Sequence, residues 1–281
     1  MLSAAESYCA EQLRQFDRDR YLTAIFAPDT KRGALFAIYA FNLEIAKTRE
    51  TVSQPMVGQI RLQWWRDALD EIEAGKTRGH EVVRALADAI ARHGLQRAHF
   101  DRLIDAREFD LEDRQPADFP QLEAYAEASA VPLILLALKV LDAETEASAA
   151  AARHIGIAQA LTGLLRAVPA HARAKRLYLP QRLTEAAELK TRDLFELRST
   201  PALGTVVGVL AEAAQNHLAA ARSYAPKIPS AALPALLPAV LTQSQLHVIA
   251  QVAGDIFQPR VAMPRPFAPM VLAWKNAFGR F

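Results

Sequence analysis

Hydrophobic residues recur every three or four positions along most of this chain, which places them on one face of an α-helix. Leu2, Ala5, Cys9 and Leu13 form one such stripe, and the segment 58–73 carries another. The alternation of Val, Ile and Thr that is typical of strands is nearly absent, so the pattern predicts an all-α protein. The expected helices are Met1–Phe16, Pro28 through Leu43, Gly58–Glu73, Glu81–His93, Ala98–Asp113, Phe119 to beyond Pro132, Glu144–Ala167, Leu183–Leu189, Pro201–Ala225, Ala235–Ala253 and Met270–Phe281.

Glycine and proline divide these helices. Gly94 is expected to cap the helix before it, Pro132 to kink a helix, and Pro169 to end one, which leaves His171 in a loop. Proline clusters in 225–234 and 257–269 predict turns. Because no long linker or fixed-period repeat separates parts of the chain, we expect a single domain spanning 1–281.

Composition narrows the class of protein. Hydrophobic residues make up 51%, mean hydropathy is +0.01, and 33 Lys and Arg oppose 31 Asp and Glu for a net charge of +2. A soluble globular protein that binds no nucleic acid is expected. The lone cysteine, Cys9, allows no intrachain disulfide and is expected in the core. No uninterrupted apolar run approaches the roughly eighteen residues that span a bilayer, and the N-terminus does not resemble a signal peptide, so a cytoplasmic location is predicted.

Five blocks of sequence suggest a family. They are Tyr39–Asn42, Arg61–Asp67, His154–Ala158, 161–166 and Arg176–Pro180. Together they resemble the squalene/phytoene synthase family along almost the whole chain. The resemblance implies the isoprenoid-synthase bundle, in which helices surround a central cavity. It also implies head-to-head joining of prenyl diphosphates, in which acids on facing helices hold the Mg²⁺ ions that neutralise the leaving pyrophosphate.

The expected metal-holding acids are missing from both motifs. Where active members have two aspartates, two variable residues and a third aspartate, this chain has Ala46, Lys47, Thr48, Arg49 and Glu50. In the second motif, Ala160, Gly163, Ala167, Ala170 and His171 replace Gln, Asn, Asp, Glu and Asp in that order. Cationic Lys47 and Arg49 would repel divalent ions. The cavity is therefore expected to be stripped of acids and to hold no metal or other cofactor.

The departures themselves resemble a non-catalytic branch of the family. Val52-Ser53, Arg61–Arg66, the segment 165–171 and Asp255–Pro259 are similar to the mitochondrial complex I assembly factor 6 group. This resemblance implies a pseudoenzyme that helps to assemble NADH:quinone oxidoreductase, with its subunits or assembly proteins as partners, at or near a membrane. Two alternatives stay open: a prenyltransferase whose Mg²⁺ site has moved to Glu44, Glu50 and Asp67, and a module that binds a lipid or prenyl ligand.

The residues expected near the cavity come from the same motifs. They are Asn42, Glu44, Glu50, Arg61, Gln63, Trp64, Arg166, Arg176 and Tyr178. Several have plainer interpretations. Trp64 and Trp65 can be core packing, and the cations Arg166 and Arg176 can bind a phosphorylated ligand or lie in solvent. Tyr178 is expected to pack against the helix of the first motif. The acids of 105–113 are interpreted as a solvated helix face with ion pairs.

Overall fold

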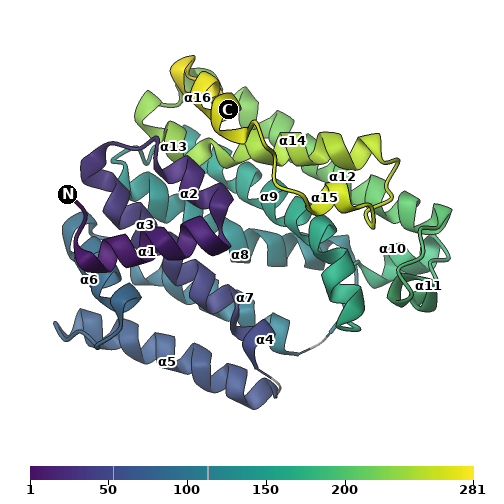
Figure 1. Cartoon of the computed structure of the whole chain (residues 1–281), viewed down its shortest axis with the longest axis horizontal. Helices are drawn as coiled ribbons and strands as arrows, with labels where there is room; N and C mark the ends of the chain where they lie inside the picture. The colour runs from purple at the N-terminus through teal and green to yellow at the C-terminus, as the bar shows by residue number, and fades with distance from the viewer. Residues whose placement is uncertain (53, 113) are drawn as a thin grey trace.

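The computed structural model describes residues 1–52, 54–112 and 114–281, and no strand occurs among them (Figure 1). The all-α prediction is confirmed. The α-helices are α1 (Ala4–Phe16), α2 (Arg18–Ala24), α3 (Asp29–Ala46), α4 (Thr48–Thr51), α5 (Pro55–Glu73), α6 (Glu81–His93), α7 (Arg97–Leu111), α8 (Phe119–Val140), α9 (Glu146–Arg173), α10 (Gln181–Ala186), α11 (Thr191–Phe195), α12 (Pro201–Ser223), α13 (Leu233–Leu236), α14 (Pro238–Gln251), α15 (Pro259–Ala262) and α16 (Ala268–Ala277). Short 3₁₀ turns at Ala225–Lys227 and Ser230–Ala232 lie in the predicted proline-rich turn.

Helix α9 lies at the centre of the bundle and packs along α8 on one side and α12 on the other. Helices α1, α3 and α6 pack together beside α8, and α5 lies against α7 at the lower edge of Figure 1. Helix α14 crosses α9 and α12, while α16, close to the C-terminus, packs on α14 at the upper end. Residues from both halves of the chain therefore face α9.

The two long central helices approach closely at a glycine. A Cβ added to Gly156 would lie 2.8 Å from Val131 Cγ2 and 3.1 Å from the backbone of Val131, too near for any larger residue without movement. Helix α9 begins with a capping box between Thr145 and Ser148, which satisfies backbone N–H groups that have no partner inside the helix. The capping box thus fixes where α9 begins, and the close contact at Gly156 fixes the face that α9 turns towards α8.

Prolines interrupt the helices less than the sequence predicts. Pro169 was expected to end a helix, yet α9 continues through it to Arg173, so the prediction that His171 lies in a loop is wrong. Proline removes one backbone donor and crowds the preceding turn, and the packing of α9 against α8 and α12 outweighs that loss. The predicted continuation of a helix past Pro132 is confirmed, because Pro132 lies inside α8. Gly94 caps α6 in the left-handed conformation, with φ of 59°, also as predicted.

Aromatic rings fill the core between α3, α5 and α7. Phe41 meets Trp65 and Phe100 edge to face, each at 5.3 Å between ring centroids. Trp65 is buried and Trp64 is half-buried, so the core-packing interpretation of this pair holds. Cys9 is fully buried, as predicted.

One helix in the described part of the chain is long and apolar enough to cross a membrane, judged by length and composition. It is α8, and 61% of its most apolar window is buried inside the protein. The segments 230–236 and 238–251 pass the same test as a pair bent by 42°.

Candidate functional site

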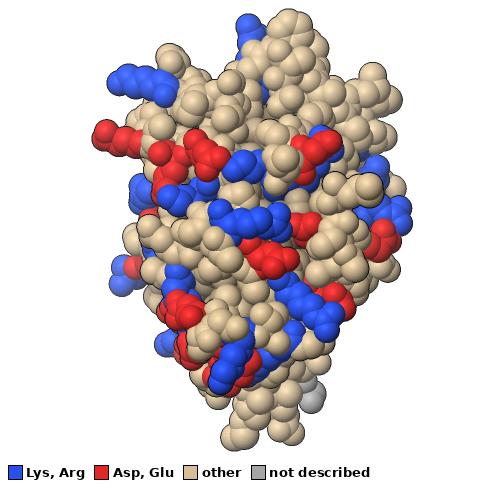
Figure 2. All heavy atoms as spheres, turned by 90° about the vertical axis from the view of Figure 1, so that its left-hand side faces the viewer, with Lys and Arg blue, Asp and Glu red and all other residues tan. Residues whose placement is uncertain are grey.

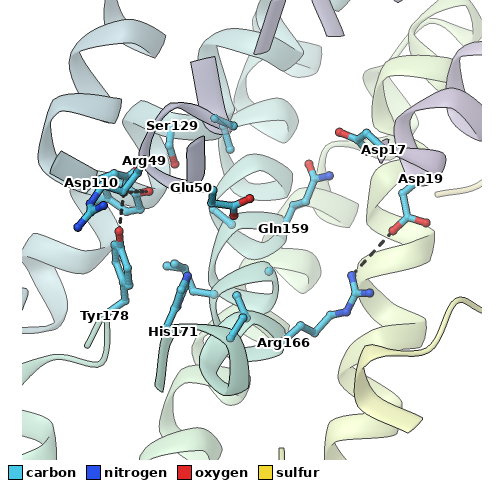
Figure 3. A pocket seen from close by; sticks show the side chains of 18 of the residues that line it. Asp17, Asp19, Arg49, Glu50, Asp110, Ser129, Gln159, Arg166, His171 and Tyr178 are labelled. Atoms are coloured by element: carbon cyan, nitrogen blue, oxygen red, sulfur yellow. Dashed lines mark hydrogen bonds and ion pairs between the residues drawn. The ribbon is translucent and has the colours of Figure 1, made fainter. Parts of the chain in front are cut away.

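A cavity of about 590 Å³ opens between α2, the α3–α4 junction, α7, α8, α9 and α14. Helix α9 supplies the longest wall, and its small residues leave the space open: a Cβ added to Gly163 would meet no atom within 4 Å. Figure 3 shows polar side chains entering the cavity from several helices. Cations on its wall include Arg49, Arg166 and Arg176.

The substituted motif positions lie on this wall. Helix α3 contributes the first, and α9 the others, at spacings that repeat one helical face. They are Ala46, Ala160, Gly163, Ala167, Ala170 and His171. Lys47 is the exception, because its Nζ lies 3.6 Å from the centre of the Phe16 ring and does not line the cavity. The Lys47 ammonium group is therefore not on the cavity wall, while Arg49 does line it.

The motif-derived candidates divide into two groups. Glu50, Arg166, Arg176 and Tyr178 line the cavity, whereas the others are not among its described lining residues. The reason is geometric, since α5 lies outside the cavity wall and only the end of α3 reaches it.

Each of the remaining candidates has another partner or place. Arg61 Nη2 donates to Glu44 Oε2 at 2.8 Å, in a pair that bridges α5 and α3. Gln63 donates to Asp67 at 2.7 Å and borders a separate shallow hollow on α5 and α7. Trp64 packs on His80 and under the Arg78 guanidinium. Asn42 is buried, and its Oδ1 has no partner among the described residues. These residues therefore support the fold around the cavity.

A buried polar network that the sequence did not reveal lies on the α7 side of the cavity. Asp110 Oδ1 accepts hydrogen bonds from the hydroxyls of Tyr125 at 2.7 Å and Tyr178 at 3.0 Å, and Asp110 Oδ2 accepts from Arg107 at 3.4 Å. Burial and the nearby Asp110 carboxylate raise the pKa of both tyrosines, so their hydroxyls stay protonated and donate. Tyr178 packs on Tyr125 and His171. Its expected contact with the first-motif helix stays a prediction.

The interpretation of the acidic run 105–113 as a solvated face holds in part. Asp105 and Glu108 pair with Arg66 in the exposed manner expected. Asp110, by contrast, is buried and points inward, and Asp113 lies outside the described residues. A signal was available: Asp110 follows the buried Leu103 by seven residues, which puts both on one helical face.

His171 occupies a motif position where the resemblance implies an acid. Burial lowers the pKa of its imidazole to about 4, so the ring is neutral near pH 7. The ring packs on Tyr178, with 4.5 Å between centroids, and its Nδ1 is buried with no partner in the described part of the chain. This wall therefore presents a neutral aromatic surface at that position.

Comparison with known proteins places this geometry in a family. A sequence profile of squalene/phytoene synthase matches residues 13–266. The chain belongs to the squalene/phytoene synthase family. Among solved structures, a dehydrosqualene synthase in complex with ligand aligns with a TM-score of 0.85 over 98% of this chain and 96% of that one, at 22% identity. A squalene synthase from Alicyclobacillus acidocaldarius aligns at 0.79 over 89% and 94%, at 19% identity, so the predicted isoprenoid-synthase fold is confirmed.

Curated relatives of this chain include complex I assembly factors and phytoene synthases. The chain is 32% identical to NADH dehydrogenase (ubiquinone) complex I, assembly factor 6 of Bos taurus, over 98% of this chain and 84% of that protein. The human assembly factor 6 is 30% identical over 97% and 83%. Phytoene synthase 3 of Zea mays is 31% identical, but the match covers 71% of this chain and 48% of that protein.

The family's Mg²⁺ chemistry requires carboxylates that converge, and the described cavity residues do not supply them. The expectation of a cavity stripped of acids is wrong, because Asp17, Asp19, Glu50 and Asp110 all line it. Asp17 and Asp19 lie at the start of α2, Glu50 on α4 and Asp110 on α7. No three His, Cys, Asp or Glu side chains in the described ranges cluster as a metal site would need. These residues do not fit the metal cluster implied for active squalene/phytoene synthases.

Most of these carboxylates already have partners. Asp17 pairs with Arg20, and Asp19 accepts from Gln245 at 3.1 Å and faces Arg166 at 4.0 Å (Figure 3). Asp110 is held by the network around Tyr178. With five arginines against four carboxylates on the described wall, the cavity is better suited to an anion than to divalent cations.

Proposed function

We propose that this protein is a non-catalytic member of its family that helps to assemble NADH:quinone oxidoreductase. The observation that carries the proposal is the match to complex I assembly factor 6 proteins, which extends over nearly the whole chain. The match to a phytoene synthase covers a smaller part of both proteins. Partners would be subunits or assembly proteins of the complex. The protein would act in the cytoplasm, peripheral to the inner membrane.

The cavity supports the non-catalytic half of the proposal. Ionising an allylic diphosphate needs positive charge at the leaving pyrophosphate, which the family's Mg²⁺ ions would supply. Removing such a stabiliser costs several kcal/mol of barrier. Positions 160, 163, 167 and 170 of α9 present only alanine or glycine to the cavity. The proposal therefore includes no Mg²⁺ and no other cofactor.

The proposal is tested by deleting the gene in its own organism. Assembled NADH:quinone oxidoreductase, measured by native gel and by NADH oxidation in membranes, should fall, while squalene and carotenoid profiles stay unchanged. The wild-type gene and a Glu50→Gln variant should both restore the complex, because Glu50 is the cavity carboxylate without an ion pair among described residues and would be needed by a relocated metal site. Normal levels of the complex in the deletion strain would contradict the proposal.

The prenyltransferase alternative predicts a different result in solution. Purified protein incubated with farnesyl or geranylgeranyl diphosphate and Mg²⁺ should release no pyrophosphate above a protein-free control. Release at an enzyme-like rate that disappears in Glu50→Gln would establish a relocated site and overturn the non-catalytic assignment.

A second candidate function is binding of a phosphorylated lipid or prenyl ligand, and the open cavity with its arginines favours it. Arg166 and Arg176 enter the cavity beside small apolar residues of α9, an arrangement that suits an anionic head and an apolar chain. Native mass spectrometry of the purified protein should then show a bound lipid that Arg166→Ala and Arg176→Ala release. Gly163→Leu, which fills open space on the same wall, should also exclude it.

A further inference from the structure

The apolar stripe of the C-terminal helix α16 points away from the protein. Helices of globular proteins normally turn such a stripe to the core. In α16 and the residues beside it, large apolar side chains recur at helical spacing and are exposed. We call them the C-terminal face: Met263, Phe267, Met270, Val271, Trp274 and Phe278. Phe267 is 68% exposed and Phe278 62% exposed, values that leave most of each ring in water.

This face belongs to a firmly attached helix. Ala268 and Leu272 are buried on its opposite side, where α16 packs on α14. The final residue, Phe281, is also buried, and its carbonyl accepts from Arg222 Nε at 3.3 Å. The helix therefore presents its outer stripe without having to detach or refold.

The charged side chains in the segment that carries the C-terminal face all have the same sign. From Ile256 to Phe281 the chain contains four cations and no Asp or Glu. The cations are Arg260, Arg265, Lys275 and Arg280. Lys275 Nζ lies 5.5 Å from the centre of the Trp274 ring, so apolar and cationic groups are interleaved. On the side of the molecule shown in Figure 2, the uppermost part, where Figure 1 places α16, carries blue side chains and no red ones.

We propose that the C-terminal face docks on a lipid bilayer that contains anionic lipids. Aromatic and aliphatic side chains with interspersed Lys and Arg, on a short helix lying flat on the surface, are what an interfacial helix needs. The apolar side chains enter the boundary between headgroups and acyl chains, and the cations meet anionic headgroups. The segment 256–281 itself contributes no acid, which favours an anionic bilayer over a general protein-binding patch, since such a patch would gain from charges of both signs.

The segment that carries the C-terminal face also contacts the wall of the cavity. Helix α15 leads into α16, and the carbonyl of Val261 in α15 accepts from Arg166 Nε at 3.4 Å. Arg166 also lines the cavity. The segment that would touch the bilayer is thus connected to the cavity wall by this hydrogen bond and by the packing of α15 on α9 and α14.

Vesicle flotation of the full chain tests the proposal, and the test does not depend on any role in complex assembly. The protein should float with phosphatidylcholine vesicles that contain about a third phosphatidylglycerol and float poorly with phosphatidylcholine alone, and high salt should weaken binding. Trp274→Ser with Phe278→Ser should reduce partitioning on the order of thirtyfold, since two half-exposed aromatic rings no longer insert. Trp274→Phe should keep binding but abolish any blue shift of tryptophan emission that vesicles cause.

A matched control removes exposed apolar surface elsewhere. Met56 and Ile60 on α5 are 69% and 63% exposed, so Met56→Ser with Ile60→Ser should leave flotation unchanged. Circular dichroism checks that both double variants fold. Equal flotation of wild type and the Trp274 and Phe278 double variant would overturn the proposal. So would a wild-type dimer, detected by light scattering, that this variant converts to monomer, because the face would then be an interface between copies.

Discussion

The buried carboxylate of Asp110 offers a sharp test of the cavity network. In Asp110→Ala, the hydroxyls of Tyr125 and Tyr178 lose their acceptor, and the buried guanidinium of Arg107 loses its counter-charge. Breaking a buried ion pair by removing one partner costs about 3–5 kcal/mol. Since water in the cavity can reach part of the network, we expect the lower end, about 3 kcal/mol. For a chain of this size that loss corresponds to a fall in Tm of roughly 6–10 °C.

The same helix supplies the matched control. Asp105 pairs with Arg66, but its side chain is 62% exposed, against 10% for Asp110, and Arg66 keeps Glu108 as a second partner. Asp105→Ala should therefore change stability by less than about 1 kcal/mol. Asp110→Asn, which keeps the acceptor for the tyrosines but removes the charge, should fall between the two alanine variants. Thermal unfolding followed by circular dichroism measures all three, and equal Tm values for both alanine variants would refute the reasoning.

Three further predictions concern glycines of α9, His171 and Cys9. Gly156→Ala should lower the free energy of unfolding by about 1–3 kcal/mol, because the added methyl group clashes with Val131. Gly163→Ala, whose methyl group enters open space, should raise it by about 0.5–1 kcal/mol. Urea unfolding measures both variants, and the reverse order of stability would contradict the packing of α9. Burial lowers the pKa of His171 from 6.5 to about 4, so the unfolded chain binds a proton at a higher pH than the folded protein does. The free energy of unfolding should therefore fall by about 2–3 kcal/mol as the pH is lowered from 6.5 towards 4. His171→Gln should flatten that part of the Tm profile relative to wild type. Cys9, buried and with its pKa raised to about 12, should react with thiol reagents only as fast as the protein unfolds, and immediate reaction would contradict its burial.

Local sequence patterns predicted the helices and the fold, because these depend on spacing and on motif residues that lie close together in the chain. Gly94 ends α6 as expected, since few residues other than glycine adopt its left-handed conformation readily. Pro169 misled the prediction because a proline rule describes an isolated helix, whereas α9 is held on two sides by α8 and α12. Tertiary packing decided that position.

The cavity was harder to predict than the fold. The motif positions on α9 reach it because they share one helical face, but Arg61 and Trp64 do not, since their direction depends on how α5 crosses its neighbours. Lys47 follows Ala46 directly and yet turns to Phe16, a contact that the local sequence does not encode. Asp110 meets Tyr178 from 68 residues away, and only the assembled fold brings them together.

The shared position of Arg166 has a thermodynamic consequence. The guanidinium of Arg166 contacts Asp19, which also lines the cavity, and the backbone of α15. An anion that draws Arg166 inward would change the support that α15 gives to the following helix. Thermodynamic linkage makes any such effect reciprocal. If a bound anion changes the affinity of the protein for a bilayer by some factor, bilayer binding changes the affinity for the anion by the same factor. Measuring either quantity would therefore report the other.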